Sequence, residues 1–196
     1  YSQGMYPLGY YPHNIHFLWS ASSLLGNSKI AIEAAKKTAE KVPVGEMNEL
    51  HFLQNFASTP LLAYTRFGKW NDILTNPKPN DSIKHLKLIW HYARGVAFTR
   101  KNNITEAQEE LEAIDVLIKD PKMETISATG FDNGTTLAKL AYEVVAGEIA
   151  SIKNDYASAI HHFKNAIKIE DALIYNEPSS WHIPPRQNLG AVLMKA

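Results

Sequence analysis

The sequence predicts an all-α fold, and three observations support this prediction. Two helical patterns meet at a turn within residues 142–169. Small residues stand where paired helices must approach each other, and their spacing of twelve residues recurs, from Gly95 to Ala107 and from Gly147 to Ala159. Gly and Pro punctuate the pattern at the expected turns and helix ends. We therefore expect one domain built from pairs of antiparallel helices.

Composition excludes several classes of protein. The chain has 196 residues, of which 45% are hydrophobic, and this suits one soluble domain with a sizeable core. Its 20 basic and 20 acidic residues cancel, so we expect no nucleic-acid partner. No apolar run reaches about 18 residues, so we expect no membrane span. The absence of cysteine excludes disulfides, thiolate metal sites and a cysteine nucleophile. The sequence does not decide between cytoplasm and periplasm.

Both ends of the sequence suggest a piece of a longer protein. The chain starts at Tyr1, with neither Met nor a signal-peptide pattern. It stops at Ala196 inside a helical pattern that has no capping or stop signal. We therefore expect residues 1–196 to form a single domain with further chain on either side.

The helices follow from periodicity and from their breakers. Pro60 lies inside one expected helix and should kink or split it, since proline removes a backbone hydrogen bond. Two stretches break the pattern and are expected to be insertions, at about 121–134 and about 171–181. The expected helices cover residues 11–25, 28–41, 46–67, a short segment from 70, 83–101, about 105–120, 135–153, 155–170 and a last one from 184.

The best-formed helix pair resembles one unit of the tetratricopeptide repeat (TPR) family, a helix-turn-helix repeat of about 34 residues. The residues that support the resemblance are Gly147, Ala159, Phe163 and Ala166. A second copy has Gly95, Ala107 and Leu111; partial copies contain Ala31 and Ile73, and a half copy contains Leu189, Gly190 and Leu193. The resemblance implies a degenerate, bacterial-type TPR-like α-solenoid of about four and a half repeats. The alternative is an irregular all-α bundle whose spacing is coincidental.

The resemblance also implies a binding surface. In such arrays the first helices of the repeats lie side by side on a concave face that usually binds a protein or peptide. The implied face is polar and mixed in charge, and it lacks the Lys and Asn pattern of TPR domains that clamp acidic chaperone tails. Its residues are His13, His16, Ser20, Ser23, Asn55, Ser58, Thr65, Arg66, Tyr92, Thr99, Arg100, Glu148, Ser151 and Gln187.

Four residues break the repeat rule, since they stand where the family has large apolar residues: His91, Glu143 and Arg186 at one position and Arg94 at another. One interpretation is structural, with the side chains reaching water. The other is a polar pocket for an anion, because Arg offers a planar fork of donors. We expect an anion or a partner's acidic group near Arg94 and Arg186, with Glu143 paired to one of these arginines.

The sequence offers no catalytic motif. His13 and His16 are three residues apart and share a helical face, and two histidines with a carboxylate can bind zinc or iron. No third ligand is close in sequence, and neither a serine-nucleophile elbow nor a phosphate-binding loop is present. We therefore expect no metal, no cofactor and no enzymatic activity.

The functional prediction is a protein- or peptide-binding scaffold. The alternative is a site around His13, His16, His91, Arg94 and Arg186 that binds a small ligand or a metal ion. Such a site could also be enzymatic. The candidate binding residues are His13, His16, Asn55, His91, Tyr92, Arg94, Glu143 and Arg186. Because the last helix lacks its partner, Leu189 and Leu193 should be partly uncovered and favour association between copies.

Overall fold

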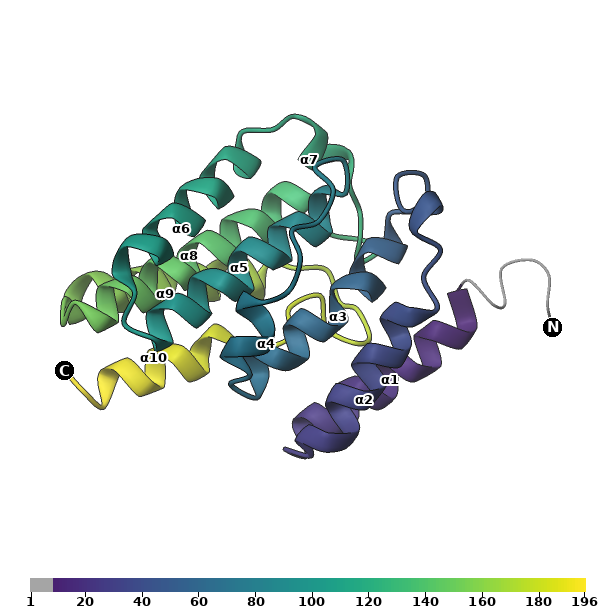
Figure 1. Ribbon diagram of the computed structural model, residues 1–196. Coiled ribbons are helices and arrows are strands. Elements are labelled where there is room, and N and C mark those ends of the chain that lie inside the picture. Colours follow the sequence, from purple (N-terminus) through teal and green to yellow (C-terminus); the bar gives the residue numbers. More distant parts are fainter. Residues whose placement is uncertain (1–8) are drawn as a thin grey trace.

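The computed structural model describes residues 9–196, which form helices and contain no β-strand (Figure 1). The prediction of an all-α fold is confirmed for this part of the chain. Residues 1–8 lie outside the described residues. They include the start of the chain, on which the expectation of preceding sequence rests. The helices are α1 (Tyr11–Leu24), α2 (Ser28–Glu40), a 3₁₀ turn η2 (Val44–Glu46), α3 (Phe52–Arg66), α4 (Trp70–Leu74), α5 (Lys84–Arg100), α6 (Ile104–Ile118), α7 (Lys122–Thr125), α8 (Gly134–Ile152), α9 (Tyr156–Asp171) and α10 (Pro185–Leu193).

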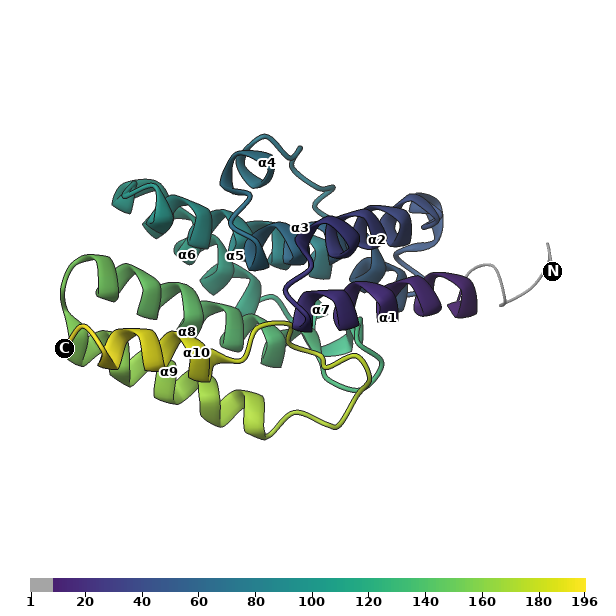
Figure 2. The same ribbon diagram turned by 90° about the horizontal axis from the view of Figure 1, so that it is seen from below.

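The helices pack in a regular order. Helices α1, α3, α5, α8 and α10 form one series, in which each contacts the next. Helices α2, α4, α6 and α9 each pack against the helix of the first series that precedes them and the one that follows them. Figures 1 and 2 show the result as a stack of antiparallel helix pairs, with α1 and α2 at one end and α9 and α10 at the other.

Four turns between paired helices have the same backbone geometry. Each contains one residue with positive φ: Gly26 (73°), Gly68 (67°), Asn102 (61°) and Asn154 (60°). Gly and Asn tolerate this left-handed conformation better than other residues. In each turn the next residue donates its backbone N–H to the carbonyl five positions earlier: Asn27 to Ser22 (2.9 Å), Lys69 to Tyr64 (2.9 Å), Asn103 to Phe98 (2.9 Å) and Asp155 to Ala150 (3.0 Å). The four helix pairs therefore share one turn type.

The residue five positions after each of these positive-φ residues faces the core. These residues are Ala31, Ile73, Ala107 and Ala159, and none of them exposes any surface. Three are small, so the second helix can approach the first closely. Gly95 allows a close approach between α5 and α8, because a β-carbon there would lie 2.9 Å from a methyl group of Val145. The recurring small residues thus set the distance between helices.

The segment expected as one helix over 46–67 differs from the prediction. Its start forms the 3₁₀ turn η2, and the α-helix begins only at Phe52. The expected split at Pro60 is wrong, because α3 runs through that residue as one helix. Proline removes a single backbone donor there, while the neighbouring Leu61 and Leu62 are buried. Packing of that apolar face outweighs the missing hydrogen bond.

The two expected insertions contact each other. The first contains the short helix α7, and the second has no helix. The side-chain amide of Asn176 donates to the backbone oxygen of Thr129 at 2.6 Å, and the backbone N–H of Ile174 donates to Asp132 Oδ1 at 3.0 Å. Figure 2 shows the loop after α9 running toward α1 before it returns to α10. None of the helices described is long and apolar enough to cross a bilayer.

Candidate functional site

A groove of about 410 Å³ runs along α3, α5, α8 and α10, and we call it the central groove. Its lining contains seven residues that the sequence analysis places on the binding face: Thr65, Arg66, Tyr92, Arg100, Glu148, Ser151 and Gln187. The other lining residues are Gly68, Trp70, Val96, Val144, Ile183, Asn188, Ala191, Val192 and Lys195. Four helices of the first series, α3, α5, α8 and α10, therefore share one continuous hollow.

A buried carboxylate lies at the floor of the central groove. Glu148 on α8 is 3% exposed, and its Oε1 accepts hydrogen bonds from Arg100 Nη2 at 2.8 Å and from Asn188 Nδ2 at 2.6 Å. A buried charge needs such partners, because desolvation without them is costly. The carboxylate joins α5, α8 and α10 and fixes the Arg100 guanidinium in the groove.

The central groove has an excess of positive charge. Arg66 Nη1 donates to the neutral amide oxygen of Gln187 at 2.9 Å, and within the described residues it has no acidic partner. Lys195 is exposed at the end of the groove, also without a described ion pair. The described lining of the groove thus has three cationic side chains, Arg66, Arg100 and Lys195, and one carboxylate, Glu148. This balance favours anionic groups.

Tyr92 forms part of the groove wall and is held by the loop before α10. Its ring lies 4.9 Å from the ring of Trp181 and 5.7 Å from the ring of His182. Burial raises the pKa of the Tyr92 hydroxyl above its usual range, and the nearby Glu148 carboxylate raises it further. Burial, with a smaller effect of Arg66, lowers the pKa of His182 to about 3. Both side chains are therefore uncharged at neutral pH.

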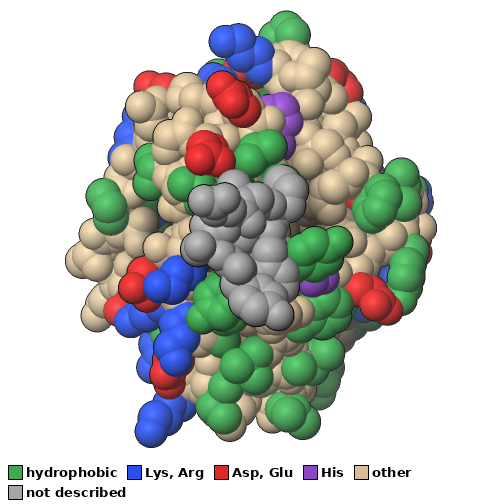
Figure 3. Space-filling model, turned by 90° about the vertical axis from the view of Figure 1, so that its right-hand side faces the viewer, with side chains coloured by type: hydrophobic (Ala, Val, Ile, Leu, Met, Phe, Trp, Pro, Cys, Tyr) green, Lys and Arg blue, Asp and Glu red, His purple; other side chains and the backbone are tan. Residues whose placement is uncertain are grey.

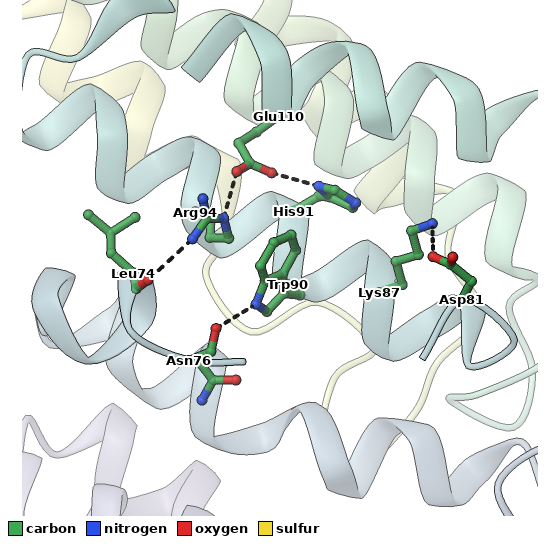
Figure 4. Close-up of polar contacts among 8 residues, drawn as sticks. All are labelled: Leu74, Asn76, Asp81, Lys87, Trp90, His91, Arg94 and Glu110. Carbon is green, nitrogen blue, oxygen red and sulfur yellow. Dashed lines mark hydrogen bonds and ion pairs between the residues drawn. The ribbon is translucent and has the colours of Figure 1, made fainter. Parts of the chain in front are cut away.

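His91 and Arg94 do not face the central groove; they bind a carboxylate of the neighbouring helix α6. Glu110 Oε2 lies 2.6 Å from His91 Nδ1, and Glu110 Oε1 accepts from Arg94 Nε at 2.6 Å (Figure 4). The Arg94 guanidinium stacks 4.3 Å from the centre of the Trp90 ring and donates to the backbone oxygen of Leu74 at 3.3 Å. These side chains are therefore held inside the fold by Glu110, since His91 is 8% exposed, and His91 does not reach water as the structural interpretation expects.

Glu143 and Arg186 also have partners other than the expected ones. The Glu143 carboxylate lies 2.7 Å from His162 Nδ1 on α9, so it does not pair with an arginine. Arg186 donates to Glu170 and to Asp171 on α9, at 3.3 Å and 2.7 Å. Arg94 and Arg186 thus contact different acidic residues on different helices, and the expected shared anion site does not form between them.

A second hollow, of about 460 Å³, lies between α1, α3 and the two insertions, and we call it the side cavity. His13, His16 and Asn55, three of the candidate residues, line it together. Thr129 and Asn176 line it from the insertions. The structure thus divides the candidate residues into three groups. His13, His16 and Asn55 line the side cavity, and Tyr92 lines the central groove. The other four, His91, Arg94, Glu143 and Arg186, line neither hollow and form ion pairs with residues of other helices.

His16 is an uncharged side chain in the wall of the side cavity. Its ring stacks on Trp19 at 4.7 Å and meets the edge of Phe56 at 5.4 Å. Burial, with a smaller effect of His13, lowers the pKa of His16 to about 3. Its Nε2 is buried and has no hydrogen-bond partner among the described residues. His16 is therefore a neutral polar group beside apolar rings.

The described residues contain no group of three or more His, Asp or Glu side chains placed to hold a metal ion. A metal site at His13 and His16, which is one form of the alternative function, needs a carboxylate beside the two histidines. The described residues place no such group of three ligands there.

Sequence reasoning missed several lining residues of both hollows. Asn188 lies on the last helix and Lys195 just after it, where the repeat pattern gives no further copy for comparison. Thr129 and Asn176 lie in insertions, which follow no periodicity. The cluster of polar turn residues from Ser127 to Gly134 was the one available signal in that region.

Comparison with models of known protein families, with curated proteins and with solved structures finds no match to this chain. The geometry of the two hollows is therefore the basis for any functional conclusion.

Proposed function

We propose that the chain is a TPR-like helical array that acts as a protein- or peptide-binding scaffold and holds an acidic segment of its partner in the central groove. The observation that supports this best is the lining of that groove. It contains Arg66 on α3, Arg100 on α5 and Lys195 just after α10, and among the described residues Glu148 is its only acidic member.

Support for the TPR-like assignment comes from the four equivalent turns. Each has a left-handed Gly or Asn followed, five residues later, by a fully buried Ala or Ile. The packing order, with each second helix between two first helices, is that of a helical repeat array. The turn alone is a common helix ending, so the support comes from its recurrence together with the buried residue five positions later and the packing order.

Support for an acidic partner comes from how the cations are placed. Arg100 is already bound to Glu148, which fixes its guanidinium and leaves its side chain 41% exposed. Arg66 is held by a neutral amide, so its charge is uncompensated by its nearest partner. Pre-positioned arginines bind carboxylates through paired N–H donors at low cost in side-chain entropy.

The test is binding of a fluorescent Asp- and Glu-rich peptide, measured by anisotropy against a Lys-rich peptide of the same length. The variants are Arg66→Gln and Lys195→Gln, and Lys164→Gln on α9 is the matched control because it removes the same charge from an exposed position outside the groove. Each groove variant should weaken binding by roughly 0.5–1 kcal/mol, as expected for partly exposed ion pairs. Added salt should weaken it further.

Two results contradict the proposal. In the first, the Lys-rich peptide binds as tightly as the acidic one. In the second, the acidic peptide binds but all three variants keep the affinity of the unchanged protein, so that its site lies away from the central groove.

A further inference from the structure

The side cavity has features of a small-molecule site that are independent of the central groove. It lies between α1 and α3 on one side and the two insertions on the other, and its volume of about 460 Å³ falls within the range of small-ligand pockets, about 300–1,000 Å³. The bond from Asn176 to Thr129 joins two lining residues, and the bond from Ile174 to Asp132 further fixes the two insertions to each other. The cavity is therefore bounded by fixed backbone.

Aromatic rings form much of the cavity wall. Phe52 and Phe56 on α3 lie edge to face with their centres 5.9 Å apart, and both line the cavity. The ring of His13 lines it from α1, where it is held edge to face on Phe17 at 4.8 Å. Rings arranged in this way offer faces and edges to a planar aromatic molecule, which prefers offset or edge-to-face contacts.

Two buried polar atoms of residues that line the cavity have no partner among the described residues: His16 Nε2 and Thr129 Oγ1. The residues are 4% and 7% exposed. They come from α1 and from the first insertion. An unpaired buried polar group is costly to the fold, so native proteins rarely keep one without a use. The two atoms themselves expose almost no surface, so a ligand with hydrogen-bonding groups at its edge would satisfy both after a small rotation of each side chain.

The charges around the side cavity exclude anionic ligands. No Lys or Arg is among the described residues of its lining, and Glu177 at the rim is the one acidic residue there. His16 has no charge at neutral pH for the reasons given above. Figure 3 views the side on which α1 begins: histidine and hydrophobic side chains lie together near its centre, and Lys and Arg gather mainly at the lower left. Phosphates and carboxylates would find no cation in the cavity.

We propose that the side cavity binds a small planar aromatic or heteroaromatic molecule without negative charge. Ring contacts with Phe52, Phe56 and His13 hold the molecule, and hydrogen bonds to His16 Nε2 and Thr129 Oγ1 orient it. This function is separate from the peptide binding proposed for the central groove.

The experiment is a titration of the chain with four probes, followed by saturation-transfer NMR. Indole and quinoline are neutral aromatic probes, one a hydrogen-bond donor and the other an acceptor, so that either tautomer of His16 has a partner. Benzoate tests the exclusion of anions, and cyclohexanol, whose ring is saturated, tests the need for an aromatic ring. At least one of the neutral aromatic probes should bind saturably, with benzoate and cyclohexanol roughly tenfold weaker or more.

Two nearly isosteric variants test the polar contacts. His16→Phe keeps a ring against Trp19, and Thr129→Val keeps the shape of the side chain; each removes one unpartnered polar atom. The matched controls are His161→Phe on α9 and Thr105→Val on α6, both exposed. The cavity variants should weaken the bound aromatic probe roughly five- to tenfold, and the controls should not change its affinity. Melting temperatures measured in parallel show that each variant is folded.

The proposal is overturned by any of three results. Neither aromatic probe binds at millimolar concentration; benzoate binds as well as they do; or folded His16→Phe and Thr129→Val variants bind the probe like the unchanged protein. The peptide-binding experiment tests only the central groove, and the probe titration tests only the side cavity. A negative result in one experiment therefore does not affect the other proposal.

Discussion

Gly147 lies directly against the ring of Phe163, so closely that a β-carbon at residue 147 would come within 2.7 Å of it. Phe163 itself is fully buried between α8 and α9. The contact fixes how near these two helices can lie, since the ring occupies the space that any other residue's side chain would need.

Replacement of Gly147 by Leu should destabilise the protein by roughly 1–3 kcal/mol or more, because the added side chain overpacks the α8–α9 contact. Gly190→Leu on α10 is the matched control, since nothing lies within 4 Å of a β-carbon at that helical position. Urea unfolding measures both variants. Equal stability of the two would show that the ring of Phe163 moves aside freely.

Glu110→Gln should destabilise the protein by roughly 1–3 kcal/mol, because it removes the charge that both His91 and Arg94 contact. The loss stays below that of a fully buried pair, since the Arg94 side chain is 19% exposed and water reaches it. Glu112→Gln on the exposed face of α6 serves as the control and should change stability little. Thermal unfolding that is the same for both variants would argue against this network.

Stability should fall as the pH drops from about 6.5 toward 4, because three histidines are buried uncharged. Burial is the main cause that lowers the pKa of His16 to about 3, of His85 to about 4 and of His182 to about 3, from an ordinary value of 6.5. Between these values the unfolded chain binds more protons than the folded one, so acid favours unfolding. Each histidine contributes a slope of up to about 1.4 kcal/mol per pH unit.

The variant His85→Leu isolates one of these contributions. Both ring nitrogens of His85 are buried without partners among the described residues, so Leu leaves no group unpaired. Denaturant unfolding at pH 7.5 and pH 5 should show a smaller acid-induced loss than in the unchanged protein. His161→Gln, at an exposed position, should keep the full loss. An unaltered slope in His85→Leu would mean that this histidine is already protonated in the folded state.

The apolar end of α10 should promote association between copies. Leu193 and Met194 are 55% and 91% exposed, and Leu189 is only partly buried. Contiguous apolar surface of this kind favours an interface. Leu193→Glu with Met194→Lys should shift sedimentation equilibrium toward the monomer. Val116→Lys, at a similarly exposed position on α6, should leave it unchanged. A monomer at high concentration without any substitution would contradict the prediction.

The sequence predicted the helix pairs well because small residues and turn residues recur at fixed spacing. Gly95 and Gly147 both lie at close contacts, and Ala107 and Ala159 are fully buried, as that spacing requires. The start of α3 was placed too early, since residues 46–51 include polar residues that suit a helix as well as a turn. Local pattern cannot distinguish these states when tertiary packing decides between them.

The candidate site was predicted less well. Arg94 lies on the side of α5 that faces α6, the second helix of the same helix pair. It binds Glu110 there, and helical periodicity alone does not predict that contact. His13, His16 and Asn55 do lie together. The cavity that joins them is completed by Thr129 and Asn176, whose loops fold back over α1 and α3 in a way that no helical period encodes.

These same loops change how the molecule should come apart. In a stack where each helix pair touches only its neighbours, unfolding can start at one end and pass from unit to unit. Here the loop before α10 places Trp181, which is 3% exposed, against Tyr92 in the middle of the stack. Its bond from Asn176 to Thr129 spans 47 residues of sequence. Unfolding of this end that reaches Trp181 therefore uncovers the centre, and we expect this end-to-middle contact to make unfolding more cooperative than in a simple stack.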